Sequence, residues 1–343
     1  MSLQKARITA IGTYVPERIL TNQDLEGMVD TSNEWIIQRT GIRERRISGP
    51  EQYTSDLGTA AVQDLMHRFN KRVDDVDLII VATSTPDFPF PSVAALMQDR
   101  LGIPASAGVI DLSAACAGFV YALHTANGFI ASGLHRKVLV VGADTLSRIT
   151  DYTDRTTCVL FGDGAGAALV ERDDEESSFE AFHLGTDGKG AMHVYRTGLA
   201  NKLNGVELQD TQLLVQNGKE VFRWAVRTVP DGMKALMDKS SLSLDQVDWF
   251  IPHSANLRII EPVCEKSGFP IERTLYSLVQ FGNTSAATIP LSLDLGIRDG
   301  RVHNGDRLLL YGFGAGLTHA GLLLKLRLDP QIQRPEIEYD QQI

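Results

Sequence analysis

The stretch Lys137-Val138-Leu139-Val140-Val141-Gly142 has a counterpart, Arg307-Leu308-Leu309-Leu310-Tyr311-Gly312, that lies 170 positions further along the chain. Each begins with a basic residue, continues through four hydrophobic residues and ends in glycine, which is typical of a buried strand that leads into a turn. Two more pairs match in the same order, at offsets of 171 and 173: residues 76–80 with 247–251, and residues 11–13 with 184–186. Self-similarity at a nearly constant spacing indicates a duplicated structural unit.

The rest of the chain alternates between short apolar runs and helix-length stretches. The apolar runs predict buried strands at residues 78–82, 109–112, 138–141, 165–170, 249–251 and 308–311. The helix-length stretches cover residues 55–69, 92–101, 118–132, 221–239, 257–267 and 285–299. This alternation predicts an α/β fold with two similar halves, 1–172 and 179–327, an acidic connector between them and a polar tail at 328–343.

The composition is that of an ordinary globular protein. With 343 residues, of which 43% are hydrophobic and 22% charged, the chain can bury a large core. Its 43 acidic residues outnumber the 33 Lys and Arg, and the net charge of −10 argues against nucleic-acid binding. The uncharged segment 308–324 contains four glycines and His319, so we expect two buried strands joined by a glycine turn and no membrane-spanning helix there.

The chain has three cysteines, Cys116, Cys158 and Cys264, without the spacing of a disulfide framework or a zinc site. We therefore expect reduced thiols, a cytoplasmic protein and no bound metal. Cys116 follows a predicted strand and precedes a helical pattern, where a helix N-terminus favours the thiolate. Taken alone, this position suits either a nucleophile or a small core residue, whereas Cys158 and Cys264 are expected in the core.

Two further residues occupy positions that suit chemistry. His253 follows the predicted strand 249–251 directly, at the edge where α/β folds place their ligand sites. Asn283 lies in a turn ahead of a helix. Taken alone, the histidine could be structural and the asparagine a helix cap. The glycine arrays 162–166 and 312–316 lack the spacing of a dinucleotide-binding loop, but the second can bring a backbone N–H close to an oxyanion.

Three motifs, taken in order, resemble the signature of the β-ketoacyl-acyl-carrier-protein synthase III family. They are Ala115-Cys116-Ala117-Gly118-Phe119, Pro252-His253-Ser254-Ala255-Asn256 and Gly282-Asn283-Thr284-Ser285-Ala286-Ala287. Residues 30–36, 39–45 and 161–166 also match, and the similarity runs from about residue 6 to residue 327. The family has a thiolase-like fold, in which two βαβαβαββ halves form a five-layer αβαβα arrangement within a tight homodimer. The offset of about 170 agrees with this duplication.

The resemblance implies a reaction and a catalytic role for each matching residue. Cys116 would take the acyl group of acetyl-CoA or of a short branched acyl-CoA. His253 and Asn283 would hold the thioester carbonyl of malonyl-acyl carrier protein while it loses CO₂. Backbone N–H groups of Cys116 and Gly314 would form the oxyanion hole. The products would be β-ketoacyl-acyl carrier protein and coenzyme A, formed without a cofactor at the start of type II fatty-acid synthesis.

The resemblance also implies binding residues. Trp35 and Arg155 would enclose the adenine of coenzyme A, and Thr31, Arg39 and Asn256 would line the pantetheine channel. Phe90 would reach into the acyl pocket of the partner subunit. Acyl carrier protein would dock on Arg223, Arg258 and Lys266. Two positions depart from many family members: Ser254 stands where they carry Gln, and Glu265 replaces a basic residue found in some.

Two other functions remain open at this point. One is a different acyl transfer or condensation of the thiolase superfamily, such as the start of a secondary metabolite. Thiolases proper use a second catalytic cysteine late in the chain, and the array 312–316 has none. The other is a catalytically silent dimer partner, which typically loses its nucleophile, whereas Cys116, His253 and Asn283 are all present.

Overall fold

The computed structural model describes residues 4–331, whose two large sheets share the order of four corresponding strands. The first sheet contains, in spatial order, β1 (Lys5–Tyr14), β7 (Asp163–Asp173), β6 (Lys137–Thr145), β4 (Leu78–Ala82) and β5 (Gly108–Leu112). The second contains β8 (Phe179–Thr186), β15 (Thr318–Lys325), β14 (Arg307–Gly314) and β13 (Trp249–Pro252). Each sheet contains a corresponding parallel pair, β4 with β6 and β13 with β14, and antiparallel strands continue the sheet from β6 and from β14. The two strand orders confirm that the chain contains a duplicated α/β unit.

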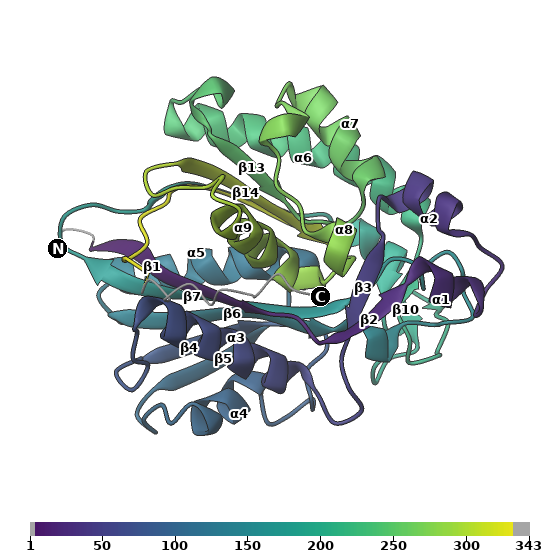
Figure 1. The fold of residues 1–343 in the computed structure, drawn as a ribbon, viewed down its shortest axis with the longest axis horizontal. Coiled ribbons are helices and arrows are strands. Elements are labelled where there is room, and N and C mark those ends of the chain that lie inside the picture. The colour runs from purple at the N-terminus through teal and green to yellow at the C-terminus, as the bar shows by residue number, and fades with distance from the viewer. Residues whose placement is uncertain (1–3, 332–343) are drawn as a thin grey trace, which may run out of the picture.

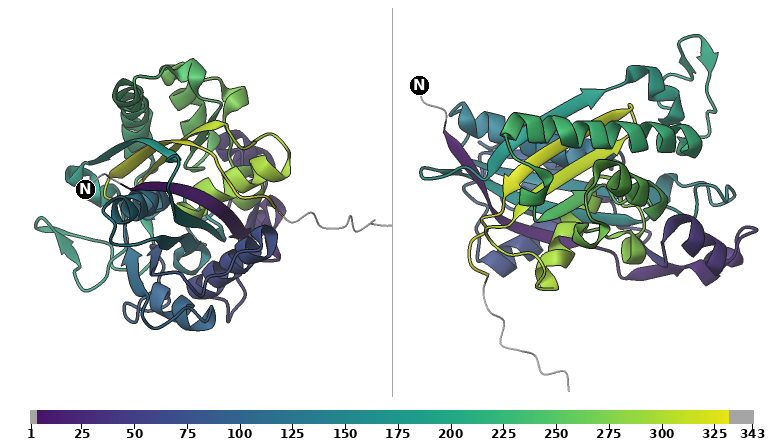
Figure 2. Two further views of the ribbon diagram at one scale, coloured as in Figure 1. Left: turned by 90° about the vertical axis from the view of Figure 1, so that its left-hand side faces the viewer. Right: turned by 90° about the horizontal axis from the view of Figure 1, so that it is seen from above.

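Helices lie on both faces of each sheet, giving five layers (Figure 1). Helices α5 (Gly118–Ala131) and α9 (Thr288–Arg298) fill the layer between the sheets. Helices α3 (Thr54–Phe69) and α4 (Val93–Arg100) cover the outer face of the first sheet. Helices α6 (Gly218–Ser240) and α7 (Leu257–Ser267) cover the second, and α6 lies across β14 and β15 in the right-hand view of Figure 2. The predicted thiolase-like αβαβα arrangement is confirmed.

Two equivalent glycines bring the central layer close to the sheets. A Cβ atom on Gly312 would lie 2.6 Å from the Cα of Ala117, and one on Gly142 would lie 2.7 Å from the carbonyl oxygen of Ala286. The two contacted segments are the 3-10 turns η1 (Ala115–Ala117) and η6 (Ser285–Ala287), which precede α5 and α9. The glycine that ends each matching sequence stretch is therefore required by close packing.

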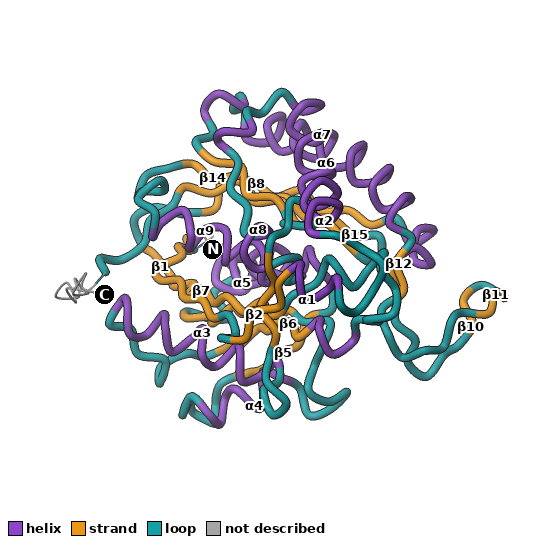
Figure 3. Tube along the Cα trace, turned by 45° about the vertical axis from the view of Figure 1, so that its right-hand side comes forward, coloured by secondary structure: helices purple, strands orange, loops and turns teal. Residues whose placement is uncertain are grey.

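The smaller elements gather at one end of the layers, on the right in Figure 1. They are β2 (Arg18–Thr21), α1 (Asn22–Glu26), α2 (Asn33–Thr40), β3 (Glu44–Ile47), β9 (Val194–Tyr195), β10 (Lys202–Leu203), β11 (Val206–Glu207), β12 (Val215–Gln216) and α8 (Leu278–Phe281). The β10–β11 hairpin projects from the body of the molecule (Figure 3). Within residues 4–331, no helix combines the length and the hydrophobicity that crossing a membrane requires. The segment 308–324 forms the antiparallel pair β14–β15, as predicted.

Two secondary-structure elements differ from the sequence-based expectations. Strand β5 was expected to be buried, but it is the edge of the first sheet, with Val109 36% and Ile110 39% exposed. An apolar run in the sequence does not show whether the strand lies in the centre or at the edge of its sheet. The helix expected at residues 285–299 begins with the turn η6, and α9 itself starts at Thr288.

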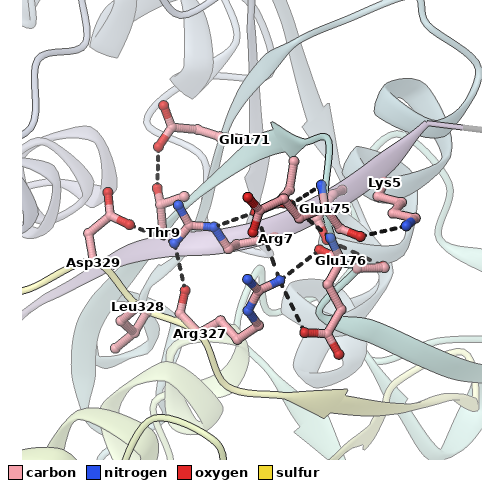
Figure 4. A network of polar contacts seen from close by, with 12 residues as sticks. Lys5, Arg7, Thr9, Glu171, Glu175, Glu176, Arg327, Leu328 and Asp329 are labelled. Carbon is pink, nitrogen blue, oxygen red and sulfur yellow. Dashed lines mark hydrogen bonds and ion pairs between the residues drawn. The ribbon is translucent and has the colours of Figure 1, made fainter.

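The expected tail begins later than residue 328. Arg7 of β1 pairs with Asp173 at 2.9 Å and with Asp329 at 2.6 Å, and its guanidinium also donates to the carbonyl of Arg327 (Figure 4). Lys71 pairs with Asp329 as well, and Leu328 is buried. The ion pairs of Asp329 and the burial of Leu328 together hold residues 327–329 against the first sheet. Of the predicted tail, 328–343, residues 332–343 lie outside the described residues.

Candidate active site

Cys116 lies in the turn η1, directly before the central helix α5. Its neighbour Ala115 has a φ of 45°, a left-handed conformation that turns the chain sharply after β5. The thiol donates a hydrogen bond to the hydroxyl of Ser285 at 3.6 Å. Burial raises the pKa of the Cys116 thiol to about 12, although the position before a helix was expected to favour the thiolate. Desolvation of the charged form is the largest cause of this shift, and it opposes the effect expected of a helix N-terminus.

Gly314, at the end of β14, lies against the nucleophile. A Cβ atom on Gly314 would lie 3.0 Å from the Cβ of Cys116 and 3.2 Å from both its backbone nitrogen and its sulfur. Only a residue without a side chain allows β14 to approach the thiol this closely. The backbone of Gly314 is thus near the place where an acyl carbonyl on Cys116 would be, as an oxyanion hole requires.

We expect Gly314→Ala to slow acylation of Cys116 by about 100-fold, because the added methyl group would occupy the space of the acyl carbonyl and displace nearby donors. The rate is measured by intact-protein mass spectrometry after mixing with acetyl-CoA. Gly128→Ala is the matched control, since Gly128 lies on α5, the helix that follows Cys116, and an added Cβ there meets nothing within 4 Å. Acylation of Gly314→Ala at the wild-type rate would contradict the close approach.

His253 follows β13 and is held from three sides. Its backbone N–H donates to the carbonyl of Tyr311 at 2.8 Å, its ring packs edge-on against Phe313, and its Nδ1 lies 2.8 Å from the Thr288 hydroxyl. The side chain is 2% exposed, and burial lowers its pKa to about 3. The imidazole is therefore neutral at physiological pH, with one ring nitrogen protonated.

The hydrogen bonds around Thr288 decide which ring nitrogen of His253 carries the proton. The Thr288 hydroxyl lies 3.0 Å from the carbonyl of Ser285 and 2.8 Å from Nδ1 of His253, and its single hydrogen is donated to one of the two. When it goes to Ser285, the hydroxyl oxygen accepts from Nδ1 of His253. When it goes to His253, Nδ1 is the acceptor. A ring that accepts at Nδ1 has its hydrogen on Nε2. In the second arrangement, Nε2 of His253 carries the hydrogen and is the donor available to the cavity that His253 lines.

Acidification is expected to destabilise the fold between pH 6.5 and pH 5. Burial lowers the pKa of His253 to about 3 and that of His319 to about 4, both from an ordinary value of 6.5. The unfolded chain therefore binds protons below pH 6.5 that the folded chain does not, so this stability is complete above pH 6.5 and decreases as the pH falls. Two such groups contribute about 3 kcal/mol over this window.

Melting temperature measured from pH 7.5 to pH 5 checks this expectation. His319→Gln removes one of the two titrations and keeps a partner for the Tyr311 hydroxyl, which lies 2.8 Å from Nδ1 of His319. Its melting temperature should fall less steeply than that of the wild type over the same pH range. Equal slopes for the two proteins would show that His319 is not the group that titrates.

Asn283 lies after α8, where a parallel bridge joins it to Phe161. Its backbone N–H donates to the carbonyl of Leu160 at 2.8 Å, and its side-chain Oδ1 accepts the N–H of Ser285 at 2.9 Å. The amide is thereby oriented, since its oxygen is occupied and its NH₂ group remains available as a donor. The alternative role of Asn283 as a helix cap or turn residue does not conflict with donation, because its Oδ1 holds the N–H of Ser285, two residues further on, while its NH₂ group can donate.

Cys116, His253 and Asn283 line one cavity of about 130 Å³, although they come from different halves of the chain. Most of its wall is apolar: Leu146, Ile149, Leu160, Phe161, Val194, Leu214, Val221, Ile259 and Phe313. The cavity shares Leu160, Tyr195, Gln216, Asn256 and Ile259 with a larger one of about 890 Å³. Together the two cavities form a channel, with Cys116, His253 and Asn283 at its inner end.

The outer part of the channel carries cationic side chains. The outer part is lined by the cationic residues Arg39, Arg155, Lys219 and Arg258, and also by Trp35. The guanidinium carbons of Arg155 and Arg39 lie 5.3 and 5.9 Å from the Trp35 ring centre. Arg155 therefore covers the ring that was expected to stack on adenine, and an adenine between them requires that Arg155 move away.

The remaining predicted residues lie in several different places. Asn256 lines the channel and caps α7, whereas Thr31 is not among the residues that line either cavity. Phe90 is 86% exposed, outside the channel. Arg258 lies at the channel mouth. Arg223 lies in a separate groove beside α6, where it is paired with Glu220. Lys266 lies in the last turn of α7. The structure thus does not bring the three expected docking residues together in one cavity. Cys158 and Cys264 are buried, as expected.

Sequence reasoning missed several residues of the site. Ser285 contacts the thiol, Thr288 orients His253, and Lys219 lies at the channel mouth. Ser285 follows Ala115 by the same 170 positions that relate the two halves, so the repeat could have indicated that its turn faces the turn of Cys116. The described residues contain no group of three or more His, Cys, Asp or Glu arranged to hold a metal ion.

Comparison with known proteins gives one consistent result. Residues 110–188 match the 3-oxoacyl-[acyl-carrier-protein] synthase III family, and residues 237–326 match its C-terminal family. The chain is 64% identical to β-ketoacyl-[acyl-carrier-protein] synthase III 2 of Halalkalibacterium halodurans over 95% of this chain and 98% of that one. It is 56% identical to the Bacillus subtilis protein of the same name over 94% of this chain and 99% of the relative.

Solved structures agree with the sequence relatives. The synthase III of Thermus thermophilus is 46% identical, with a TM-score of 0.90 over 94% of this chain and 99% of that chain. A priming β-ketosynthase of the R1128 polyketide pathway is 35% identical, with a TM-score of 0.88 over 96% and 98%. The relatives match in sequence over nearly their whole length, and the fold and the Cys-His-Asn cavity are both present. The chain belongs to the β-ketoacyl-acyl-carrier-protein synthase III family of condensing enzymes.

Proposed function

We propose that this enzyme transfers a short acyl group from coenzyme A to Cys116 and condenses it with malonyl-acyl carrier protein, at the start of type II fatty-acid synthesis. The observation that carries the proposal is the cavity in which Cys116, His253 and Asn283 meet at the inner end of a channel with a cationic mouth. Acetyl-CoA and short branched acyl-CoA thioesters are the expected primers, since the cavity around the thiol is small and apolar.

The first half-reaction exchanges one thioester for another. The Cys116 thiolate attacks the acyl carbon, the carbonyl oxygen becomes an oxyanion, and the coenzyme A thiolate leaves. Donors at the position of the oxyanion lower this barrier, and the N–H groups of Cys116 and Gly314 are the proposed donors. The acyl group then remains on Cys116, and the released coenzyme A thiolate takes up a proton from solvent.

The second half-reaction requires two donors that carry no negative charge. Malonyl thioester loses CO₂ and leaves an enolate, whose oxygen accepts hydrogen bonds from Nε2 of His253 and from the NH₂ group of Asn283. The enolate carbon attacks the acyl group on Cys116, and the β-ketoacyl thioester departs on the carrier protein. Both steps use protein groups and the two substrates alone, so we assign no metal or cofactor to them.

The channel fits a pantetheine arm, which both substrates carry. Lys219 and Arg258 at its mouth suit the phosphates of coenzyme A and the phosphopantetheine of the carrier protein. The positive charge at the mouth also provides a local attraction for an acidic carrier protein, although this chain has a net charge of −10. Arg258 is the docking residue that this geometry favours, whereas Arg223 and Lys266 would have to contact other parts of the carrier protein.

A homodimer is the proposed assembly. The edge strand β5 leaves a row of backbone groups unpaired, and Val109 and Ile110 on it are exposed together with Phe88 and Phe90 in the loop before α4. Exposed edges with apolar side chains are normally covered by a partner. A second copy paired along β5 would bury this surface and bring Phe90 toward the partner's acyl pocket. The free thiols suit a cytoplasmic location.

Intact-protein mass spectrometry tests the proposal. The enzyme is incubated with acetyl-CoA, isobutyryl-CoA and octanoyl-CoA in competition, the adduct is mapped by digestion, and malonyl-acyl carrier protein is then added. We expect one adduct, on Cys116, that disappears as β-ketoacyl-acyl carrier protein forms. No adduct from any of the three thioesters would overturn the proposal.

The second candidate is the priming of a polyketide, which is favoured by the similarity to the solved priming β-ketosynthase. The same reaction would then serve a different carrier protein. Condensation with the carrier protein of fatty-acid synthesis and with one from a polyketide pathway, compared by kcat/KM, separates these two possibilities.

A further inference from the structure

Arg45 lies on β3, the strand beside α8 (Figure 1), and is a fully buried side chain that the steps above do not use. Its Nε and Nη2 both donate to the carbonyl oxygen of Val159, at 3.2 and 2.5 Å, and its Nη1 donates to Oδ1 of Asn22 at 2.5 Å. Burial lowers the pKa of the Arg45 guanidinium to about 10, so the group is still charged at physiological pH. A buried cation thus donates to oxygens of neutral groups.

The segment that Arg45 binds is the segment that holds Asn283. Leu160 follows Val159 in the chain, and its carbonyl accepts the backbone N–H of Asn283 at 2.8 Å. The N–H of Gly162 donates to the carbonyl of Asn283 at 3.0 Å. These two hydrogen bonds belong to the parallel bridge described above. The backbone of Asn283 is therefore placed by a segment whose adjoining peptide group is bound to the guanidinium.

The aliphatic part of Arg45 packs against the same bridge. A Cβ atom on Gly282, the residue before Asn283, would lie 2.9 Å from Cγ of Arg45 and 2.8 Å from the carbonyl oxygen of Leu160. A Cβ atom on Gly162 would lie 3.3 Å from Cβ of Arg45. Gly282 also has a φ of 66°, which glycine adopts without strain. The side chain of Arg45 thus contacts both segments of the bridge.

Asn22 orients the guanidinium. Asn22 is fully buried, and its Nδ2 donates to the carbonyl of Ile42 and to Oδ1 of Asn33, both at 3.0 Å. Because both hydrogens of the NH₂ group are used, the Oδ1 of Asn22 is the atom that faces Nη1 of Arg45. Arg45 cannot turn away from Val159 without leaving buried polar groups unpaired, which is costly.

We propose that Arg45 is a positioning residue for Asn283: by fixing residues 159–162 it aims the NH₂ group of Asn283 at the enolate oxygen during condensation. This inference rests on the proposed function, in which that NH₂ group donates to the enolate. Within the described chain, the residues that line the channel do not include Arg45, so it acts through Asn283 and does not touch the substrate. A misplacement of about 1 Å in a catalytic group can slow a reaction roughly 100-fold.

Arg45→Lys tests the proposal when the two half-reactions are measured apart in the full-length protein. Lysine keeps the positive charge, but its single nitrogen cannot bind Val159 and Asn22 as the planar guanidinium does. We expect CO₂ release from malonyl-acyl carrier protein by the acetylated enzyme to be about tenfold slower. Formation of the acetyl adduct on Cys116, followed by intact mass, should change by less than about twofold, because acylation does not use Asn283.

A double-mutant cycle separates positioning from general destabilisation. A residue that acts through Asn283 has no further effect on condensation once the NH₂ group is gone. Arg45→Lys in the Asn283→Ala background should therefore slow CO₂ release by less than about a further twofold. Arg46→Lys is the matched control, because Arg46 lies on the same strand but pairs with Glu44, and it should change neither half-reaction. An equal effect of Arg45→Lys in both backgrounds, an equal loss in both half-reactions, or no loss at all would overturn the proposal.

Two variants of Asn22 provide the test if Arg45→Lys fails to fold. Asn22→Asp keeps an oxygen acceptor for Arg45 and loses the donors to Asn33 and Ile42, whereas Asn22→Ala loses all three contacts. The proposal predicts that the alanine variant releases CO₂ more slowly than the aspartate variant, and equal rates would contradict it. Full CO₂ release by Asn283→Ala would overturn the proposed function itself, whereas full release by the Arg45 and Asn22 variants alone would overturn only this inference.

Discussion

Cys116→Ala is expected to abolish acyl transfer and condensation, with a loss of roughly 10⁴-fold or more in kcat/KM, while the protein remains folded. Acylation and carbon–carbon bond formation both involve a bond to the Cys116 sulfur, and no other thiol lines the cavity. The thiol is half-buried and makes one hydrogen bond, to Ser285, so its removal costs little stability. Intact mass after incubation with acetyl-CoA and the melting temperature measure the two effects separately.

The other two cysteines provide the matched control for Cys116→Ala. Cys158 and Cys264 are buried, and burial raises the pKa of Cys158 to about 11, so neither thiol is available as a nucleophile. Cys158→Ala should therefore keep the full acetyl adduct, although it leaves a small cavity that lowers the melting temperature. An adduct that persists in Cys116→Ala and maps to another residue would show that Cys116 is not the acylated residue.

The duplication could be predicted from sequence because its cause is local. In each half a strand ends against the segment that leads into a central helix, and the close contact there requires glycine. The glycines at 142 and 312 therefore mark the repeat in the sequence. Sheet position is different, since it depends on what covers a strand. The apolar run at β5 predicted burial, and the structure shows that Val109 and Ile110 are exposed at an edge.

The candidate site was predictable where a residue type and its motif define the chemistry. Cys116, His253 and Asn283 were expected together, and the structure places them in one cavity. The protonation of the thiol was not predictable, because the helix N-terminus is visible in the sequence and the burial that raises the pKa is not. The burial of Asp144 was not predictable for the same reason, since a single aspartate after an apolar run gives no sign that its carboxylate will accept hydrogen bonds from the hydroxyls of Thr83 and Thr85.

Asn283→Ala is expected to slow the condensation step by about 10²- to 10³-fold and to change acylation of Cys116 by less than about tenfold. Decarboxylation develops negative charge on the thioester oxygen, and the Asn283 NH₂ group is one of two side-chain donors placed to stabilise it. Acylation depends on other donors, the backbone N–H groups near Gly314. The two half-reactions are measured apart, as formation of the acetyl adduct and as CO₂ released from malonyl-acyl carrier protein by the acetylated enzyme.

Asn283→Asp separates donation from local structure. Asn283 Oδ1 also accepts the N–H of Ser285 at 2.9 Å, so the alanine variant removes a structural contact together with the donor. Aspartate keeps that acceptor but replaces the NH₂ group with an anionic oxygen, which repels the enolate. The aspartate variant should therefore fold like the wild type and lose condensation at least as severely as the alanine variant. An equal loss in both half-reactions for Asn283→Asp would instead assign Asn283 to substrate binding, because a residue that acts on the enolate has no effect before decarboxylation begins.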